Sequence, residues 1–161
     1  MSSDQPKGPS REEKRQMKSA ARLYAVQALF QMEAAGQTVE KVRREFLDHR
    51  FGEEVAGEAL AEGDPELFSR LLDEAVNWQA KIDQMTDRAL VATWPIDRID
   101  PTIRALFRAA AAEILATDTP PKVVITEFVD VARAFFPEGR EPKFVNAVLD
   151  HMAREAKPEA F

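Results

Sequence analysis

The stretch SREEKRQMKSAARLYAVQALFQMEAA, residues 10–35, decides the architecture expected for this chain of 161 residues. Ser10 and Glu13 fit the S-x-x-E capping box, which predicts that a helix begins there. The positions with the spacing that packs a helix on a core are Leu23, Val26, Leu29 and Phe30. We therefore expect one helix whose C-terminal half is anchored in the protein and whose N-terminal half presents cations.

Those cations form a stripe along the first half of the predicted helix. At about 100° per residue, four of them fall on one narrow face and a fifth flanks it. The four are Arg11, Arg15, Lys18 and Arg22, and the flanking residue is Lys14. The chain as a whole has a net charge of −6, and residues 1–24 contribute +3, which leaves −9 for the rest. An acidic body repels a polyanion, so any contact with nucleic acid should be local to this helix. On charge alone, a solvated face remains the simpler interpretation.

The composition excludes several classes of protein. Hydrophobic residues at 45% and charged residues at 31% are typical of a soluble globular domain. The absence of cysteine excludes disulfides and thiol nucleophiles, and it is compatible with a reducing cytoplasm. No apolar run reaches the roughly 20 residues of a membrane span, and the first residues lack the apolar core of a secretory signal. We expect a cytoplasmic protein without a membrane contact.

The rest of the chain also predicts helices. Gly36 predicts the end of the first helix. The further helical segments are expected over about 39–50, from Asp64-Pro65 to Trp94-Pro95, from Asp100-Pro101 to Thr119, over 122–136 and from Pro142 onward. The second of these tracts permits one long helix or two with a break near residue 80. Both tryptophans, Trp78 and Trp94, are expected in the core or at its boundary.

Two segments leave an alternative open. The β-branched residues at 123–126 suggest a strand, but the apolar spacing over 124–135 favours a helix. The segment 51–66 holds three glycines and six acids, which predicts a solvated acidic loop rather than an acidic docking surface. We expect an all-α bundle of six or seven helices, with a disordered lead-in over 1–9, one domain over 10–156 and a frayed tail over 157–161.

The search for catalytic or metal-binding residues finds no constellation. His49 and His151 lack metal-ligand spacing, and neither a glycine-rich phosphate loop nor a G-x-S-x-G motif is present. Asp97 and Asp100 stand beside prolines, where turn and capping roles account for them. We therefore predict no catalytic residue, no metal site and no cofactor, and hence a protein that is not an enzyme.

Four stretches are informative when they are read together: ARLYAVQALFQ at 21–31, FRAAAAEIL at 107–115, PPKVVITEFVDVAR at 120–133 and KFVNAVLD at 143–150. Together they resemble the NusB family of bacterial transcription antitermination factors. They follow the order and spacing of the family, and the resemblance extends from Lys14 to about Arg154. It implies two packed three-helix sub-bundles and no catalysis. It also implies binding of boxA RNA jointly with the ribosomal protein NusE, in a complex with other Nus factors and RNA polymerase that promotes transcription of ribosomal RNA operons.

The resemblance also implies the residues that contact these partners. With the basic stripe, the expected RNA-binding residues are Arg11, Lys14, Arg15, Lys18, Arg22, Arg140, Lys143 and Phe144. The residues expected to contact NusE are Phe30, Ala34, Ile103 and Arg104. The sequence departs from the family at Ser19, Ala20 and Ala21, where many members carry arginine, and at Ile103, where some members carry an acid.

Several of these residues also fit a purely structural role. Phe144 lies on an apolar stripe that suits the core, Phe30 fits the core as well as an interface, and Lys143 fits a solvated surface. For Asn146 we favour a hydrogen bond between helices over an RNA contact. A homodimer is compatible with the family.

The alternative function is that of a NusB-like interaction module without antitermination activity of its own, as in the N-terminal domain of some RNA methyltransferases.

Overall fold

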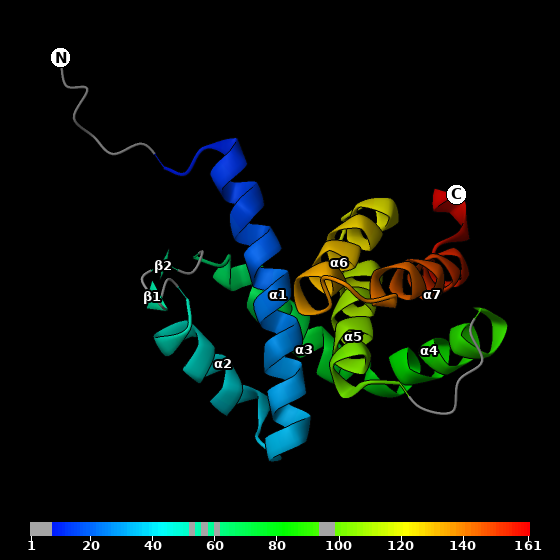
Figure 1. Ribbon diagram of the computed structural model, residues 1–161, viewed down its shortest axis with the longest axis horizontal. Helices are drawn as coiled ribbons and strands as arrows, with labels where there is room; N and C mark the ends of the chain where they lie inside the picture. The colour runs from blue at the N-terminus through cyan, green and yellow to red at the C-terminus, as the bar shows by residue number, and fades with distance from the viewer. Residues whose placement is uncertain (1–7, 52–53, 56–57, 60–61, 94–98) are drawn as a thin grey trace.

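Seven α-helices make up most of the described chain (Figure 1). The computed structural model describes residues 8–51, 54–55, 58–59, 62–93 and 99–161. The helices are α1 (Arg11–Ala35), α2 (Val39–His49), α3 (Pro65–Asn77), α4 (Gln79–Thr93), α5 (Pro101–Ala116), α6 (Pro121–Phe135) and α7 (Glu141–Ala156). The predicted all-α bundle is confirmed.

The helix ends follow the local signals of the sequence. Ser10, Thr38, Asp64 and Asp100 each accept, through the side chain, a hydrogen bond from a backbone N–H of the first turn that follows. These N-caps satisfy donors that have no partner inside the helix. Gly36 ends α1 with a left-handed φ of 63°, a conformation that a residue without a Cβ adopts at little cost.

The long tract that permitted one helix or two divides into α3 and α4 at Trp78. Trp78 is 44% exposed, and its indole Nε1 donates a hydrogen bond of 2.8 Å to Glu74, so the prediction of a position in the core or at its boundary is wrong for this residue. An indole can lie on the surface when its ring packs along its own helix and its N–H finds a partner there. Trp94 and Asp97 lie outside the described residues. The tract at 123–126 belongs to α6, so the helical alternative is confirmed.

Two short elements differ from expectation. Within the predicted acidic loop, β1 (Glu54–Val55) pairs antiparallel with β2 (Glu58–Ala59). Strands of two residues are too short to show an alternating pattern in sequence. At the other end, the predicted frayed tail forms a 3-10 helix, η1 (Pro158–Ala160), and Lys157 Nζ donates to Thr117 O over 3.1 Å. Of the predicted lead-in, 1–9, only Gly8 and Pro9 are among the described residues.

Helix α5 occupies the centre of the bundle (Figure 1). It contacts α1 and α3 on one side and α6 and α7 on the other, while α4 packs on α7 and α5. Helices α1, α2 and α3 contact one another, and so do α5, α6 and α7. The bundle therefore consists of two groups of three helices, and α4 packs on the group formed by α5, α6 and α7. None of the described helices is long and apolar enough to cross a membrane.

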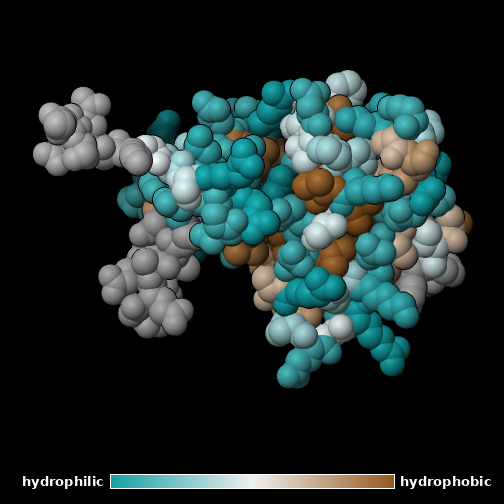
Figure 2. Space-filling model, turned by 90° about the horizontal axis from the view of Figure 1, so that it is seen from above, coloured by the Kyte–Doolittle hydropathy of each residue, from teal (hydrophilic) through white to brown (hydrophobic). Residues whose placement is uncertain are grey.

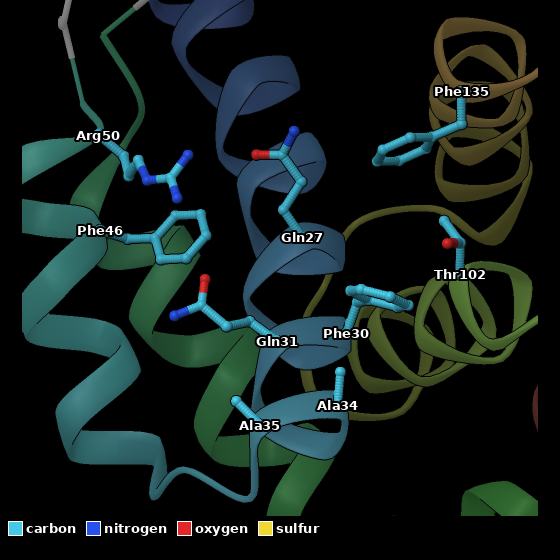
Figure 3. Close-up of a pocket in the computed structure, with 9 residues that line it drawn as sticks. All are labelled: Gln27, Phe30, Gln31, Ala34, Ala35, Phe46, Arg50, Thr102 and Phe135. Carbon is cyan, nitrogen blue, oxygen red and sulfur yellow. The ribbon is translucent and has the colours of Figure 1, made fainter.

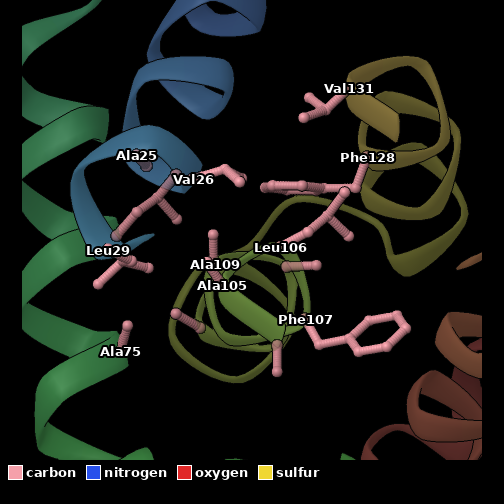
Figure 4. Packing of buried hydrophobic residues seen from close by; sticks show 14 of the residues in the cluster. Ala25, Val26, Leu29, Ala75, Ala105, Leu106, Phe107, Ala109, Phe128 and Val131 are labelled. Atoms are coloured by element: carbon pink, nitrogen blue, oxygen red, sulfur yellow. The ribbon is translucent and has the colours of Figure 1, made fainter. Parts of the chain in front are cut away.

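Small residues allow the central helix to be enclosed. The run Ala109–Ala112 is no more than 1% exposed, which brings neighbouring helices close to α5. Figure 4 shows Val26 and Leu29 of α1 and Phe128 of α6 directed at this helix. Larger side chains fill the space between the helices, where Phe107 of α5 packs edge-on against Phe144 of α7 with ring centroids 5.9 Å apart. The core therefore fixes α1 against both α5 and α6.

Candidate nucleic-acid and partner interface

Four of the five cations predicted on the first half of α1 lie on the surface. Arg11, Lys14, Arg15 and Lys18 are exposed. Arg15 forms an ion pair of 2.8 Å with Glu12 one turn earlier, and this hydrogen bond lowers the pKa of the Glu12 carboxyl. Both side chains of that pair are more than half exposed, so the pair contributes little and leaves the guanidinium accessible to another anion.

Arg22, the fifth predicted cation, lies inside the protein. It is 4% exposed, and its guanidinium donates two hydrogen bonds of 2.8 Å to the fully buried Glu113 of α5. Glu127 of α6 lies 3.4 Å from the same group. Burial lowers the pKa of Arg22, but the hydrogen bonds and charge of Glu113 outweigh it, so the pKa is raised overall. The structure therefore corrects the prediction that Arg22 is on the RNA-facing surface.

The sequence carried a signal for this buried pair. Arg22 stands between Ala21 and the apolar positions of the anchored half, and Glu113 is the single acid in the run AAAAEIL of α5. A lone charge inside each of two apolar helix faces indicates that the two charges pair with each other. Pairing of this kind ties α1 to α5 at the point where the basic half ends.

The exposed cations point in the same direction as the buried face of α1. Lys14 precedes Ala21 by seven residues and Lys18 precedes Ala25 by seven, which is almost two helical turns in each case. Ala21 and Ala25 are fully buried. Figure 1 shows the N-terminal part of α1 extending beyond the other helices. The basic half is therefore an overhang whose cations face the space above the end of the bundle.

Two hollows flank this overhang. On one side, Lys14 and Lys18 line a hollow of about 360 Å³ with Asp64 and Pro65, where Asp64 N donates to Met17 O over 3.0 Å. On the other side, Arg15 lines a groove of about 540 Å³ between α1 and α6. Figure 2 views the molecule from this end and shows a mostly hydrophilic face with an apolar patch.

The remaining predicted RNA-binding residues lie around the start of α7. Arg140 and Lys143 are exposed. Asn146, for which the sequence favours a structural hydrogen bond between helices, is exposed as well. Phe144 is 8% exposed and packs on Phe107, so the structure places its ring in the core rather than on the surface, as the apolar stripe suggested. The prediction of Phe144 as an RNA contact is corrected accordingly.

A second groove, of about 390 Å³, holds two of the residues predicted to contact NusE (Figure 3). Phe30 is 39% exposed and lines this groove with Ala34. Thr102 at the start of α5 and Phe135 at the end of α6 line it as well. An exposed aromatic ring in a groove lined by α1, α2, α5 and α6 is typical of a protein-binding surface.

The two predicted residues of α5 behave differently from Phe30. Ile103 is 2% exposed, so its side chain belongs to the core and the prediction of a partner contact there is corrected. Its neighbour Thr102 lines the groove instead, because one step along a helix turns a side chain by about 100°. Arg104 lies 3.9 Å from Asp83 and 3.7 Å from Asp87 of α4, so its guanidinium is held within an ion-pair network.

The comparisons with known proteins agree with this geometry. A profile described as the NusB family matches residues 19–154. The chain belongs to the NusB family. It is 45% identical to the transcription antitermination protein NusB of Agrobacterium fabrum over 97% of this chain and 94% of that protein. It is 48% identical to the NusB protein of Caulobacter vibrioides over 88% of this chain and 95% of that protein.

Solved NusB structures share the fold. The T. maritima NusB structure superposes with a TM-score of 0.69 at 28% identity, covering 97% of this chain and 99% of that one. A crystal structure of NusB and NusE in complex with double-stranded RNA has the same TM-score, 0.69, at 22% identity, covering 91% of this chain. At that identity the likeness shows the fold alone.

The NusB assignment agrees with the expectation of a protein that is not an enzyme, since the matched relatives are named as antitermination proteins. Among the described residues, no group of three or more histidine, aspartate and glutamate side chains is placed to hold a metal ion. The structure thus gathers the exposed part of the predicted site into the overhang, the Phe30 groove and the start of α7.

Proposed function

We propose that this protein is a cytoplasmic transcription antitermination factor that binds boxA-type single-stranded RNA together with the ribosomal protein NusE. In this role it acts with other Nus factors and RNA polymerase to promote transcription of ribosomal RNA operons. The observation that carries the proposal is the overhang, where Arg11, Lys14, Arg15 and Lys18 are exposed in an otherwise acidic chain. The name shared by the relatives supports it.

The overhang suits a single-stranded polyanion. Arginine and lysine neutralise phosphates and release condensed counterions, so affinity should fall as salt rises. The bases of single-stranded RNA are unstacked and can be read at their edges or by stacking. Arg140 and Lys143 at the start of α7 are exposed and supply two further cations.

The Phe30 groove supports the second part of the proposal, the docking of NusE. Aromatic side chains are enriched at protein interfaces, and Phe30 is 39% exposed, whereas the neighbouring Val26 and Leu29 of the same helix are buried. NusE adds a second RNA-contacting surface, which raises the affinity beyond that of either protein alone. A homodimer is compatible with the family, and one that covered this surface would compete with NusE.

The double variant Arg15→Glu with Lys18→Glu tests the RNA surface. Loss of two phosphate contacts should reduce the magnitude of the slope of log K against log salt by about 1.4 for a single strand. The measurement is fluorescence anisotropy with labelled boxA RNA at several salt concentrations, with and without NusE. Helicity and melting temperature should stay close to the wild type, because both side chains are exposed.

A matched control is Lys41→Glu with Arg44→Glu on α2. These two cations are exposed and three residues apart, as Arg15 and Lys18 are, and they change the net charge equally. If the RNA affinity falls equally in both variants, net charge alone explains the loss, and the assignment of the overhang as the RNA-binding surface is contradicted. Retention of RNA and NusE binding without antitermination in transcription assays would instead favour the alternative of an interaction module.

A further inference from the structure

A further hollow, of about 230 Å³, lies where the ends of α1 and α3 meet the start of α4. Figure 4 shows Leu29 of α1 and Ala75 of α3, which both line it, next to each other beside α5. The lining residues that give it its chemistry are Leu29, Met32, Glu33, Val76, Gln79 and Arg108. We term this hollow the Arg108 cavity. None of its lining residues lines the Phe30 groove or is among those predicted to bind RNA.

Apolar side chains form part of the Arg108 cavity and continue onto the surface beside it. Leu29 is buried and Met32 is half-buried, whereas Val76 is 39% exposed. Trp78, two residues further along the chain, is 44% exposed, and Lys81 Nζ lies 5.4 Å from the centroid of its ring. Exposed apolar groups that gather beside a hollow are typical of a surface that another molecule covers. The cavity is smaller than the roughly 300–1,000 Å³ of small-molecule sites, which favours a protein side chain as its occupant.

Arg108 brings a buried guanidinium to the cavity. Its Nε and Nη2 donate hydrogen bonds of 3.1 and 3.0 Å to Asp83, and its Nη1 donates one of 2.6 Å to Glu33. A guanidinium carries five N–H groups, so two of those on Arg108 have no acceptor within the described part of the chain. Because a buried donor without an acceptor is costly, an occupant that supplies a carbonyl oxygen is favoured here. A backbone carbonyl of a bound chain supplies one without adding a charge.

The charges around the cavity sum to a negative value. Glu33, Asp83 and Asp87 form one ion-pair network with Arg104 and Arg108, so three carboxylates face two guanidiniums. The side chains of Glu33 and Asp87 are 57% and 65% exposed, and both can therefore meet a charged group of another molecule. This rim repels the phosphates of RNA and attracts a lysine or arginine of a protein.

We propose that the Arg108 cavity docks a protein of the antitermination complex other than NusE. The docked segment places an apolar side chain against Leu29 and Val76, a backbone carbonyl on Arg108 and a lysine or arginine beside Glu33. This inference rests on the proposed function and adds a third interface to the RNA surface and the Phe30 groove. Because the cavity shares no lining residue with either, RNA and NusE do not use the groups that it offers.

Photocrosslinking from position 79 tests the cavity in the full chain. Gln79 is exposed at the rim, so replacing it by p-benzoylphenylalanine leaves the core intact. The complex is assembled from the purified protein, boxA RNA, NusE, RNA polymerase and the other Nus factors. Irradiation should crosslink position 79 to one protein other than NusE, at a peptide in which an apolar residue adjoins a lysine or arginine. Crosslinks to NusE or RNA alone, or no crosslink at all, would overturn the inference.

The variant Val76→Lys tests the chemistry of the cavity. The added ammonium faces the cation of the partner, so the crosslink yield from position 79 should fall about tenfold or more. The matched control is Val91→Lys on α4, where a valine that is 76% exposed and lies outside the cavity takes the same charge. The control should crosslink like the wild type. An unchanged yield in Val76→Lys, or an equal loss in both variants, contradicts docking in the cavity.

Anisotropy with boxA RNA and NusE separates this inference from the proposed function. Both lysine variants should bind RNA and NusE as the wild type does, which also shows that they are folded. If the wild type binds neither, the proposed function fails and the docking assignment fails with it. If the wild type binds both and position 79 crosslinks to no protein other than NusE, only the docking assignment is overturned.

Discussion

Replacing Arg22 by methionine should destabilise the protein without removing an RNA contact. The side chain of Glu113 is fully buried, and both of its oxygens accept hydrogen bonds of 2.8 Å from Arg22. Methionine keeps much of the apolar volume of the arginine stem but leaves this carboxylate without its counter-charge. Removing one partner of a buried ion pair costs about 3–5 kcal/mol, which is a large share of the stability of a domain of this size.

The double variant Arg22→Met with Glu113→Leu isolates the source of that cost. Replacing a whole buried pair by apolar residues of similar size is often neutral or even stabilising, so most of the lost free energy should return. The assay is urea unfolding followed by circular dichroism on the wild type, both single variants and the double variant. Anisotropy with boxA RNA at temperatures where all variants are folded completes the set.

The result that would refute this reasoning is specific. Suppose that the free energy of unfolding of Arg22→Met lies within 0.5 kcal/mol of the wild-type value, on the order of a neutral surface change. If the variant also reduces the magnitude of the slope of log K against log salt for RNA binding, then Arg22 contacts phosphate. In that case the buried pair does not persist in solution. An unchanged slope with reduced stability supports the structural role.

Three further predictions concern the packing and the turn. Phe144→Ala should lower the free energy of unfolding by about 3–5 kcal/mol in urea titrations, because the ring is buried against Phe107; a change below 1 kcal/mol, on the order of a surface substitution, would argue for an exposed ring. Gly36→Ala should cost about 1 kcal/mol by the same measurement, from the left-handed backbone alone, since an added Cβ meets no atom within 4 Å. Burial raises the pKa of the Tyr24 hydroxyl, so above pH 10 the unfolded chain loses this proton before the folded chain does, and the free energy of unfolding decreases. In urea unfolding, this decrease between pH 8 and pH 10.5 should be smaller in Tyr24→Phe than in the wild type. Equal decreases in the two proteins would contradict the effect of burial.

Much of the fold could be predicted from local signals. The caps at Ser10 and Asp64 and the stop at Gly36 act within one or two turns, so the sequence around each contains all the information it needs. The helix over 121–135 was also predictable, because its apolar period extends over several turns. The two-residue strands were not, since their pairing depends on backbone contacts that leave no pattern.

The site was less predictable than the fold. Helical periodicity placed Arg22 on the basic stripe correctly, but it could not show that α5 covers that stripe from residue 21 onward. Ile103 and Thr102 differ by one position, and only the packing of α5 decides which of them faces the Phe30 groove. A pattern on one helix gives the direction of a side chain, whereas its exposure depends on neighbours distant in sequence.

The overhang has a consequence for the energetics of α1 itself. Its four exposed cations lie within the first two turns or so of the helix, near the end that carries the positive pole of the helix dipole. Arg11 opposes the dipole in the first turn, and the cations repel their like-charged neighbours one turn away along the helix. The acids of the first turn that offset this are Glu12 and Glu13. A bound polyanion supplies the missing negative charge at the helix N-terminus. Binding therefore stabilises the very turns that bind, and these turns should show the largest gain in amide-exchange protection when RNA is present.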